Sequence, residues 1–289
     1  MPTHLENFVS YIGRTHLKGK SKSKNKTMSK SRTTINKLNN NYNTLFRYLK
    51  IGFIKILTNK YSEDHKYYND QIKYISLFHI TRRGEGISLF VKYKQKKYVY
   101  KIIYNIHSDY DSLMNIQNKM AAKKLSPKII NLFSEPEKLG DTNVQKLMRK
   151  KDLVFIIMDY IDSMELRDYY DDIIKHMDPH TADKEIKRIV IYLNKFLKAL
   201  RKIGVCHLDF TLDNILYSKS NKRIYLIDYG WMEHLTDDNP CIDAELDFIL
   251  KTKRPYYRQR IKSMFNDYNK HFNKKYKLIK TSDNYLKLY

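Results

Sequence analysis

The sequence predicts an α+β fold, with strands first and helices dominating the second half. Short runs between residues 75 and 104 have the spacing of strands, and a fully apolar run follows at 153–158. A long stripe of apolar residues at helical spacing then fills 183–203, ahead of two further short strands. The 289 residues are enough for one large or two small domains with a substantial core.

Composition narrows the class of protein. Hydrophobic residues make up 42% of the chain and aromatic residues 13%, so most of it should fold. The two cysteines, Cys206 and Cys241, suggest neither a disulfide framework nor a zinc site, and a reducing compartment fits them best. We expect no membrane span, because no apolar run approaches the roughly 20 residues that one requires. The N-terminus also lacks the apolar core of a signal peptide.

The formal charge of +24 lies mainly in the two ends of the chain. Residues 1–50 hold eleven Lys or Arg and one acid, and residues 251–289 hold twelve against two acids, so each end carries +10. The remaining 200 residues carry only +4. These basic tails predict contact with a polyanion such as nucleic acid. Alternatively, a genome of low GC content could account for the many lysines without a polyanion partner. Lys, Asn, Tyr and Ile all have AT-rich codons, and all four are abundant here.

The first part of the chain is predicted to be a tail and a helical extension. Residues 1–40 read as a disordered basic arm, because they are polar and too poor in apolar groups to offset the entropy of ordering. The run at 18–32 suits nuclear import or phosphate binding, with a merely solvated tail as the alternative. Residues 41–74 form the extension, and within it 43–58 has apolar positions at helical spacing.

A hairpin and a third strand follow. Residues 75–80 alternate as a strand, and Gly84-x-Gly86 turns the chain into a second strand that contains Val91. Glycines let a backbone approach a phosphate closely, although an ordinary turn has the same residues. The strand at 97–104 places Lys101 on an apolar face, where a nucleotide phosphate would satisfy its charge. The alternative is an edge-strand lysine that points to water.

Two helices are predicted on either side of a buried strand. Residues 109–124 have one apolar face on which Gln117 is the polar exception, and the strand is the run at 153–158. The clearest helix begins at Thr181 or Asp183 as N-cap and ends at Gly204.

Residues 207–228 contain the candidate residues for proton transfer and metal binding. The stretch reads HLDFTLDN at 207–214, then two short strands at 215–217 and 224–227, then Asp228. A hairpin of these strands would lay Asn214 and Asp228 close together at its open end. An Asp, an Asn five residues on and a second Asp nineteen residues after the first can converge on one phosphate group. Asp209 would receive a hydroxyl proton, while Asn214 and Asp228 would hold Mg²⁺.

Several of these motifs resemble the protein-kinase-like superfamily. The stretch 207–214 resembles its HxDxxxxN catalytic loop, and IDYG at 227–230 resembles its DFG turn. The glycines followed by Val91 resemble the glycine-rich loop, and Lys101 resembles the phosphate-binding lysine of the third strand. The strand that ends at Met158 resembles the one leading into the hinge. The motifs occur in the family's order over about 75–250, and the Lys-, Asn- and Tyr-rich style resembles the divergent kinases of large DNA viruses.

The resemblance implies a two-lobed kinase-like fold with a basic N-terminal arm, an N-lobe at 75–158 and a reduced C-lobe at 159–289 that ends in a basic tail. ATP and Mg²⁺ would be the cofactors. Roles then fall to residues of both lobes: Asp209 and Asn214 in catalysis, Asn214 and Asp228 as metal ligands, and Gly84, Gly86, Lys101, Met158, Asp159 and Ile161 in nucleotide binding. His207 would support the loop by hydrogen bonding.

The departures from the family pattern are also informative. Leu208 stands where regulated kinases carry Arg, so no activation-loop phosphate switch is expected. Thr211 is closer to small atypical kinases, and Leu89 replaces the third glycine of the loop. Asp109 and Asp111 are the acidic candidates to pair with Lys101. No APE motif follows Gly230, which leaves 59 residues for the substrate-binding part. Within them, a helix at 242–250 would support the catalytic loop through Asp243 or Asp247.

These residues predict an intracellular phosphotransferase, an atypical serine/threonine-protein kinase that acts on a protein rather than a small molecule. It would work in the cytoplasm or nucleus, or in a host cell or virion if the chain is viral. One alternative is a pseudokinase scaffold that binds nucleic acid or acidic partners through the basic tails. Retention of Lys101, Asp209, Asn214 and Asp228 argues against it. The other is a small-molecule kinase, which predicts an acidic pocket for a cationic substrate, whereas the C-terminal region is strongly basic.

Overall fold

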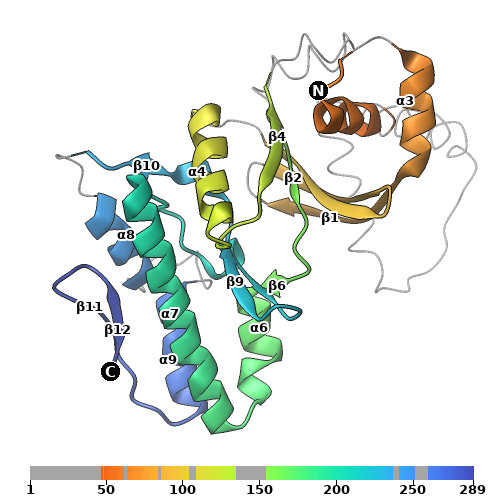
Figure 1. Ribbon diagram of the computed structural model, residues 1–289. Coiled ribbons are helices and arrows are strands. Elements are labelled where there is room, and N and C mark those ends of the chain that lie inside the picture. Colours follow the sequence, from red (N-terminus) through yellow and green to blue (C-terminus); the bar gives the residue numbers. More distant parts are fainter. Residues whose placement is uncertain are drawn as a thin grey trace, which may run out of the picture. The chain divides into compact units, whose positions relative to one another are not determined.

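The computed structural model describes residues 47, 49–61, 64–83, 86–103, 109–134, 154–236, 241–250 and 260–289. The basic arm predicted at 1–40 and the first glycine, Gly84, lie outside these residues. The chain divides into two compact units. Figure 1 colours the chain along its sequence, from the N-terminus to the C-terminus. The first unit comprises residues 1–106 and 130–160, and the second comprises 107–129 and 161–289.

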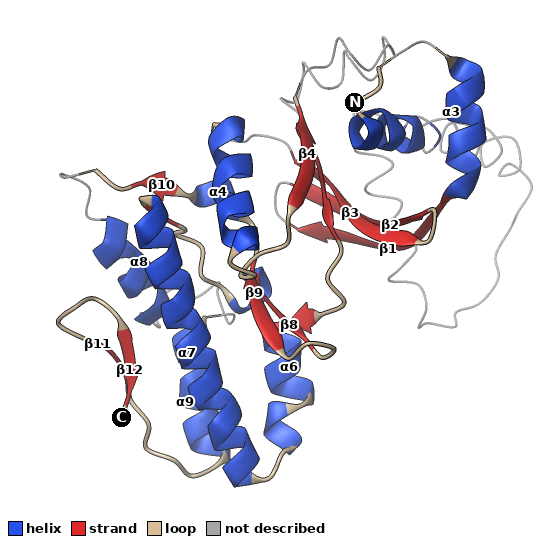
Figure 2. Ribbon diagram, in the orientation of Figure 1, coloured by secondary structure: helices blue, strands red, loops and turns tan. Residues whose placement is uncertain are grey.

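The first unit is built on a five-stranded sheet with strand order β1-β2-β3-β5-β4 (Figure 2). The pairs β1–β2, β2–β3 and β3–β5 are antiparallel. The predicted strands are therefore present, and β4 is an addition that the sequence did not suggest. The strands are β1 (Ile75–Arg83), β2 (Gly86–Tyr93), β3 (Lys96–Ile103), β4 (Ile129–Phe133) and β5 (Val154–Asp159). A short helix, α3 (His65–Gln71), precedes the sheet, and Asp64 caps its N-terminus.

The two faces of this sheet differ in what covers them. One face packs against the helical residues 49–58, where Phe53 meets the rings of Tyr93, Tyr98 and Tyr100 edge-on. The pairing register places Lys101 opposite Ser88 on one side and Ile156 on the other, so these three side chains share the second face. The sheet thus has a buried outer face and a second face that carries the lysine.

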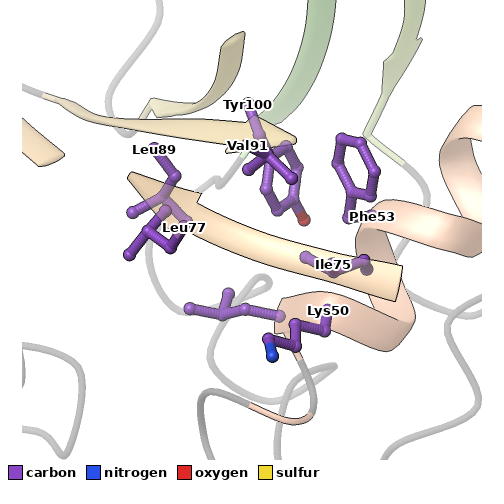
Figure 3. A pocket seen from close by; sticks show the side chains of 8 residues that line it. Lys50, Phe53, Ile75, Leu77, Leu89, Val91 and Tyr100 are labelled. Carbon is purple, nitrogen blue, oxygen red and sulfur yellow. The ribbon is translucent and has the colours of Figure 1, made fainter. Parts of the chain in front are cut away.

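Val91, the residue that follows the glycines in the glycine-loop resemblance, lies on the outer face of the sheet. It is 3% exposed and lines a small apolar cavity together with Tyr100 (Figure 3). Because side chains alternate along a strand, the neighbouring Phe90 faces the Lys101 side instead, opposite Val99. The residue of β2 that shares the Lys101 face beyond Ser88 is therefore Phe90 and not Val91.

The second unit is mainly helical. Its longest helix, α7, begins at Pro179 and ends at Gly204, which has φ 87° and closes the helix in the left-handed conformation. The N-cap is Asp178, whose carboxylate accepts the N–H groups of His180 and Thr181, so the prediction of Thr181 or Asp183 was wrong. Proline is well suited to the first helical position that follows such a cap. The helices are α4 (Tyr110–Ala122), α6 (Leu166–Asp172), α7 (Pro179–Ile203), α8 (Cys241–Leu250) and α9 (Ile261–His271).

Short strands complete the second unit. The predicted hairpin is confirmed as β8 (Ile215–Ser218) paired with β9 (Arg223–Leu226), and β6 (Met164–Glu165) joins it as a third strand. Two further antiparallel pairs were not predicted: β7 (Val205–Cys206) with β10 (Glu233–His234), and β11 (Leu278–Lys280) with β12 (Leu286–Leu288). The side-chain amide of Asn194 on α7 bonds both backbone groups of Leu286, which ties β12 to that helix.

The structure joins Cys206 to Cys241 by a disulfide, whereas the sequence suggested no disulfide framework and a reducing compartment. They are 35 residues apart, and they meet because α8 packs against β7. Only that tertiary contact brings them together, so cysteine spacing alone could not reveal the pair. Among the helices that the structure describes, none has the length and apolarity to cross a bilayer.

Candidate active site

The loop at 207–214, which resembles the catalytic loop of kinases and is called the catalytic loop below, is held in shape by its own side chains. Asn214 Nδ2 donates to Asp209 Oδ2 over 2.6 Å and to the Asp209 carbonyl oxygen over 3.1 Å. The Thr211 N–H donates to the same carbonyl over 2.9 Å, which tightens the turn. The two residues that the sequence assigned to catalysis are therefore in direct contact, and the amide fixes the position of the carboxylate.

His207 connects this loop to Ile227, the residue that follows β9 and precedes Asp228. It is 0% exposed, its Nε2 lies 3.0 Å from the Ile227 carbonyl oxygen, and its Nδ1 accepts the Asp209 N–H over 3.3 Å. A carbonyl can only accept, so Nε2 carries the proton and the ring is neutral. Tyr229, the aromatic residue of the IDYG turn, packs edge-on against the ring at 4.9 Å. The supporting role predicted for His207 matches these contacts.

Two residues of the site adopt a backbone conformation that is rare outside glycine. Leu208 has φ 60° and Asp228 has φ 65°, both left-handed. The Ile227 N–H donates to the Asn214 carbonyl over 2.9 Å, so the ends of the hairpin bring Asn214 next to the turn that carries Asp228. Residues in such rare backbone conformations persist only where the surrounding contacts hold them in place, and they often mark functional sites.

A buried carboxylate supports the loop from α8. Glu245 is 0% exposed, and its Oε1 accepts the His207 N–H over 2.7 Å. Burial raises the pKa of Glu245 to about 7, against the opposing effects of the His207 N–H and the charge of Arg201. The sequence had suggested Asp243 or Asp247 for this contact, but both are exposed. The helix is as predicted, and the residue is different.

The other side of the loop is tied to α6 and to the segment before α9. Arg167 Nη1 lies 3.1 Å from Asp213 Oδ1, and the same guanidinium contacts Glu165 at 3.1 Å. Thr211, 6% exposed, forms an isolated β-bridge with Arg260. The loop is thus attached to three other elements of its unit, and none of these attachments could be read from the motif.

The nucleotide-binding candidates belong mainly to the first unit. Lys101 lies half-buried on β3, and Met158 is opposite Val99 on β5. Asp159 forms an ion pair with Lys96 over 3.1 Å. Gly86 is the first residue of β2, where an added Cβ would meet the Ile102 carbonyl oxygen at 3.0 Å. Close packing against β3 is therefore sufficient reason for glycine at that position.

The remaining candidates lie in the second unit. Ile161 accepts a hydrogen bond from the Ser163 hydroxyl over 3.0 Å through its carbonyl. Asp109 caps α4 by accepting from the Asp111 N–H and the Ser112 hydroxyl, and Asp111 is exposed. The polar exception on the apolar face of that helix, Gln117, is 3% exposed and donates to the Pro127 carbonyl over 2.9 Å. It anchors the turn that follows the helix.

Asn214 and Asp228 suit a magnesium ion. Mg²⁺ prefers oxygen ligands and typically takes one or two carboxylates together with phosphate oxygens and water. Asn214 uses its amide nitrogen on Asp209, and its amide oxygen is the atom that could accept a metal ion. An amide oxygen and a carboxylate on neighbouring segments are therefore chemically suited to a nucleotide-bound Mg²⁺.

Comparison with known proteins supports a relation to kinases, although the chain matches no protein-family model. It is 32% identical over 80 residues to the probable serine/threonine-protein kinase fnkB of Dictyostelium discoideum. It is 36% identical over 75 residues to serine/threonine-protein kinase 1 of Lymantria dispar multicapsid nuclear polyhedrosis virus. These matches cover 28% and 26% of this chain but only 14% and 25% of the two relatives.

Among solved structures, the chain is similar to the kinase PK-1 of Cydia pomonella granulovirus, with a TM-score of 0.42 and 21% identity over 58% of each chain. The two sequence matches confirm the resemblance drawn from the motifs. Over these stretches the chain is similar to serine/threonine-protein kinases, one of them viral.

Proposed function

We propose that the chain is an ATP- and Mg²⁺-dependent phosphotransferase, an atypical serine/threonine-protein kinase. The observation that carries the proposal is the contact between Asp209 and Asn214 beside the turn of Asp228. A carboxylate held by a neutral amide is positioned to accept a proton from a substrate hydroxyl. Phosphoryl transfer depends mainly on such positioning and on charge neutralisation, and this loop supplies the first.

Each part of the site has a proposed task. Asp209 orients the substrate hydroxyl and takes its proton, and Asn214 and Asp228 hold Mg²⁺. When bound, Mg²⁺ neutralises charge on the nucleotide phosphates. In the first unit, Lys101 binds the phosphates together with the backbone at Gly84 and Gly86. The adenine binds at the end of β5, through Met158, Asp159 and the following Ile161.

The face of the first sheet supports the nucleotide assignment. Lys101, Val99 and Phe90 are half-buried on the second face, whereas the outer face is closed by the helical residues 49–58. A lysine that shares its face with the apolar side chains of Val99 and Phe90 suits a ligand with an anionic group and an apolar body, and a nucleotide has both. The register also adds Phe90 as a ring that would lie against the adenine, since it shares the face of Lys101.

A pseudokinase is the second candidate. The hydrogen bonds among Asp209, Asn214 and His207 help to decide between it and an active enzyme. A site without catalytic function has no need for the Asp209–Asn214 bond or for the neutral His207 that holds the Asp209 N–H. We therefore favour an active enzyme that acts on a protein hydroxyl. The basic tails remain candidates for polyanion contact in either case.

Transfer of labelled phosphate from ATP to a generic protein substrate tests the proposal. Asp209→Asn keeps the shape of the side chain but removes the base, and we expect at least about a 100-fold loss of rate. Asp228→Asn should remove both the rate and its dependence on Mg²⁺. The matched control is Asp172→Asn on the exposed end of α6, which should leave the rate unchanged.

ATP binding measured separately distinguishes the candidates. A nucleotide at about 100 times its Kd should stabilise the fold by about 2.7 kcal/mol in a thermal-shift experiment. Stabilisation without phosphate transfer would favour the pseudokinase. Full activity of either active-site variant would overturn the assignment of these residues.

A further inference from the structure

We propose that the outer face of α7 is a binding surface for the phosphate backbone of a nucleic-acid duplex. Five lysines and one isoleucine form the exposed stripe of this helix: Lys184, Lys187, Ile191, Lys195, Lys198 and Lys202. At 100° per residue, these six positions fall within an arc of about 80°. With a rise of 1.5 Å per residue, the stripe runs for about 27 Å, and successive members are separated by one helical turn.

The acidic side chains of the same helix are all engaged elsewhere. Asp183 accepts hydrogen bonds from Tyr268, Lys274 and Tyr276. Glu185 accepts from Tyr169 and pairs with Arg188. Within the described part of the chain, the five lysines form no ion pair, and Lys195 alone has a ring contact, over Tyr192 at 4.6 Å. The helix therefore turns its acids inward and presents uncompensated positive charge.

A lysine-rich composition does not by itself produce this arrangement. The neighbouring helix α8 exposes Asp243, Ala244 and Asp247 and no lysine. If the lysines only reflected the overall composition, they would occur on the exposed faces of all helices alike. Here one long helix, α7, carries a row of lysines with no acid among them. The row also lies in the central part of the sequence, away from the two strongly basic ends.

The chemistry of the stripe selects a duplex among polyanions. Single-stranded nucleic acid is bound by stacking its bases on aromatic rings, and the stripe exposes no ring, because Tyr192 is half-buried beneath Lys195. An anionic membrane requires a row of inserted apolar side chains, and Ile191 is the stripe's one exposed apolar residue. A duplex offers evenly spaced phosphates along a stiff backbone, which a straight row of point charges can follow without reading sequence.

The test measures binding of the full-length chain to a fluorescent DNA duplex by anisotropy at several salt concentrations. Each lysine–phosphate contact contributes about 0.9 to the slope of log K against log salt. The variant with all five stripe lysines changed to Gln should therefore lose about 3 to 5 from the magnitude of that slope. A smaller variant, K187Q/K195Q/K198Q, should lose about 2 to 3 and protects the test against misfolding of the first.

The matched control changes five exposed lysines elsewhere to Gln: Lys119, Lys219, Lys270, Lys275 and Lys277. It removes the same charge and should alter the slope by less than about 1. An equal loss in both five-lysine variants would show that only net charge matters, and would overturn the proposal. Unchanged slopes in both stripe variants would do the same. So would loss of binding to polyglutamate or to phosphatidylserine vesicles while duplex binding is retained, because the stripe would then serve another polyanion.

Discussion

Replacing the buried Glu245 with Gln should remove a pH-dependent weakness of the fold. Burial raises the pKa of its carboxyl group to about 7, from an ordinary value of 4.5. At pH values between these two, the folded state holds a proton that the unfolded state has lost, so the free energy of unfolding falls as pH rises. One pKa unit corresponds to about 1.4 kcal/mol, so the penalty reaches about 3 kcal/mol by pH 8.

Glu245→Gln keeps an oxygen that can accept the His207 N–H but cannot ionise. We expect its unfolding free energy to match wild type within about 1 kcal/mol at pH 5 and to exceed it by about 2 to 3 kcal/mol at pH 8. Glu245→Ala is the contrasting variant. It leaves the buried N–H without a partner and should cost about 1–3 kcal/mol or more at both pH values.

Urea unfolding followed by far-UV circular dichroism at pH 5, 6, 7 and 8 measures these differences. The single tryptophan, Trp231, is 64% exposed, so its fluorescence would report burial poorly. The ten histidines are common to both proteins, so any pH dependence that they contribute cancels in the difference. Parallel curves for wild type and Glu245→Gln would refute the reasoning, because the carboxyl group would then titrate alike in both states.

Two further predictions concern the neighbouring residues Phe90 and Val91 of β2 and the disulfide of the second unit. Phe90→Ala should weaken ATP binding about tenfold by removing a ring from the Lys101 face, whereas Val91→Ala, on the opposite face, should cost about 2 kcal/mol of stability and leave ATP affinity unchanged. The reverse pattern in calorimetric titrations would show that the strand register is wrong. Reduction of the Cys206–Cys241 disulfide should lower the free energy of unfolding by about 4 kcal/mol. Cys241→Ala should then be insensitive to reductant, and an unchanged response in that variant would contradict the prediction.

Local signals in the sequence predicted the elements whose ends are fixed by their own residues. Gly204 ends α7 as expected, because its left-handed conformation favours glycine. The β8–β9 hairpin follows from two short apolar runs around a polar turn. The start of α7 was misjudged by a few residues, because Asp178 with Pro179 is a stronger start signal than Thr181.

Contacts between distant elements could not be predicted in the same way. The support of the catalytic loop from Glu245 depends on which face of α8 is buried, and the nearby Asp243 and Asp247 looked equally suitable. One signal was available, because Cys241, Glu245 and Ile249 recur every four residues, so the acid lies within the apolar stripe of its helix. Which alternate residues of β2 share the face of Lys101 depends on the pairing with β3. Alternation within one strand does not say which face is inward.

The disulfide closes a covalent ring that contains the candidate active-site residues of the second unit. Cys206 directly precedes the catalytic loop and Cys241 opens α8, so Asp209, Asn214 and Asp228 all lie on the chain between them. In an oxidised chain these three residues stay confined to one closed loop even after the fold is lost. A protease that cuts between the cysteines would leave two pieces that separate only on reduction. The residues proposed to handle the proton and the metal would therefore remain covalently linked when other parts of the molecule have come apart.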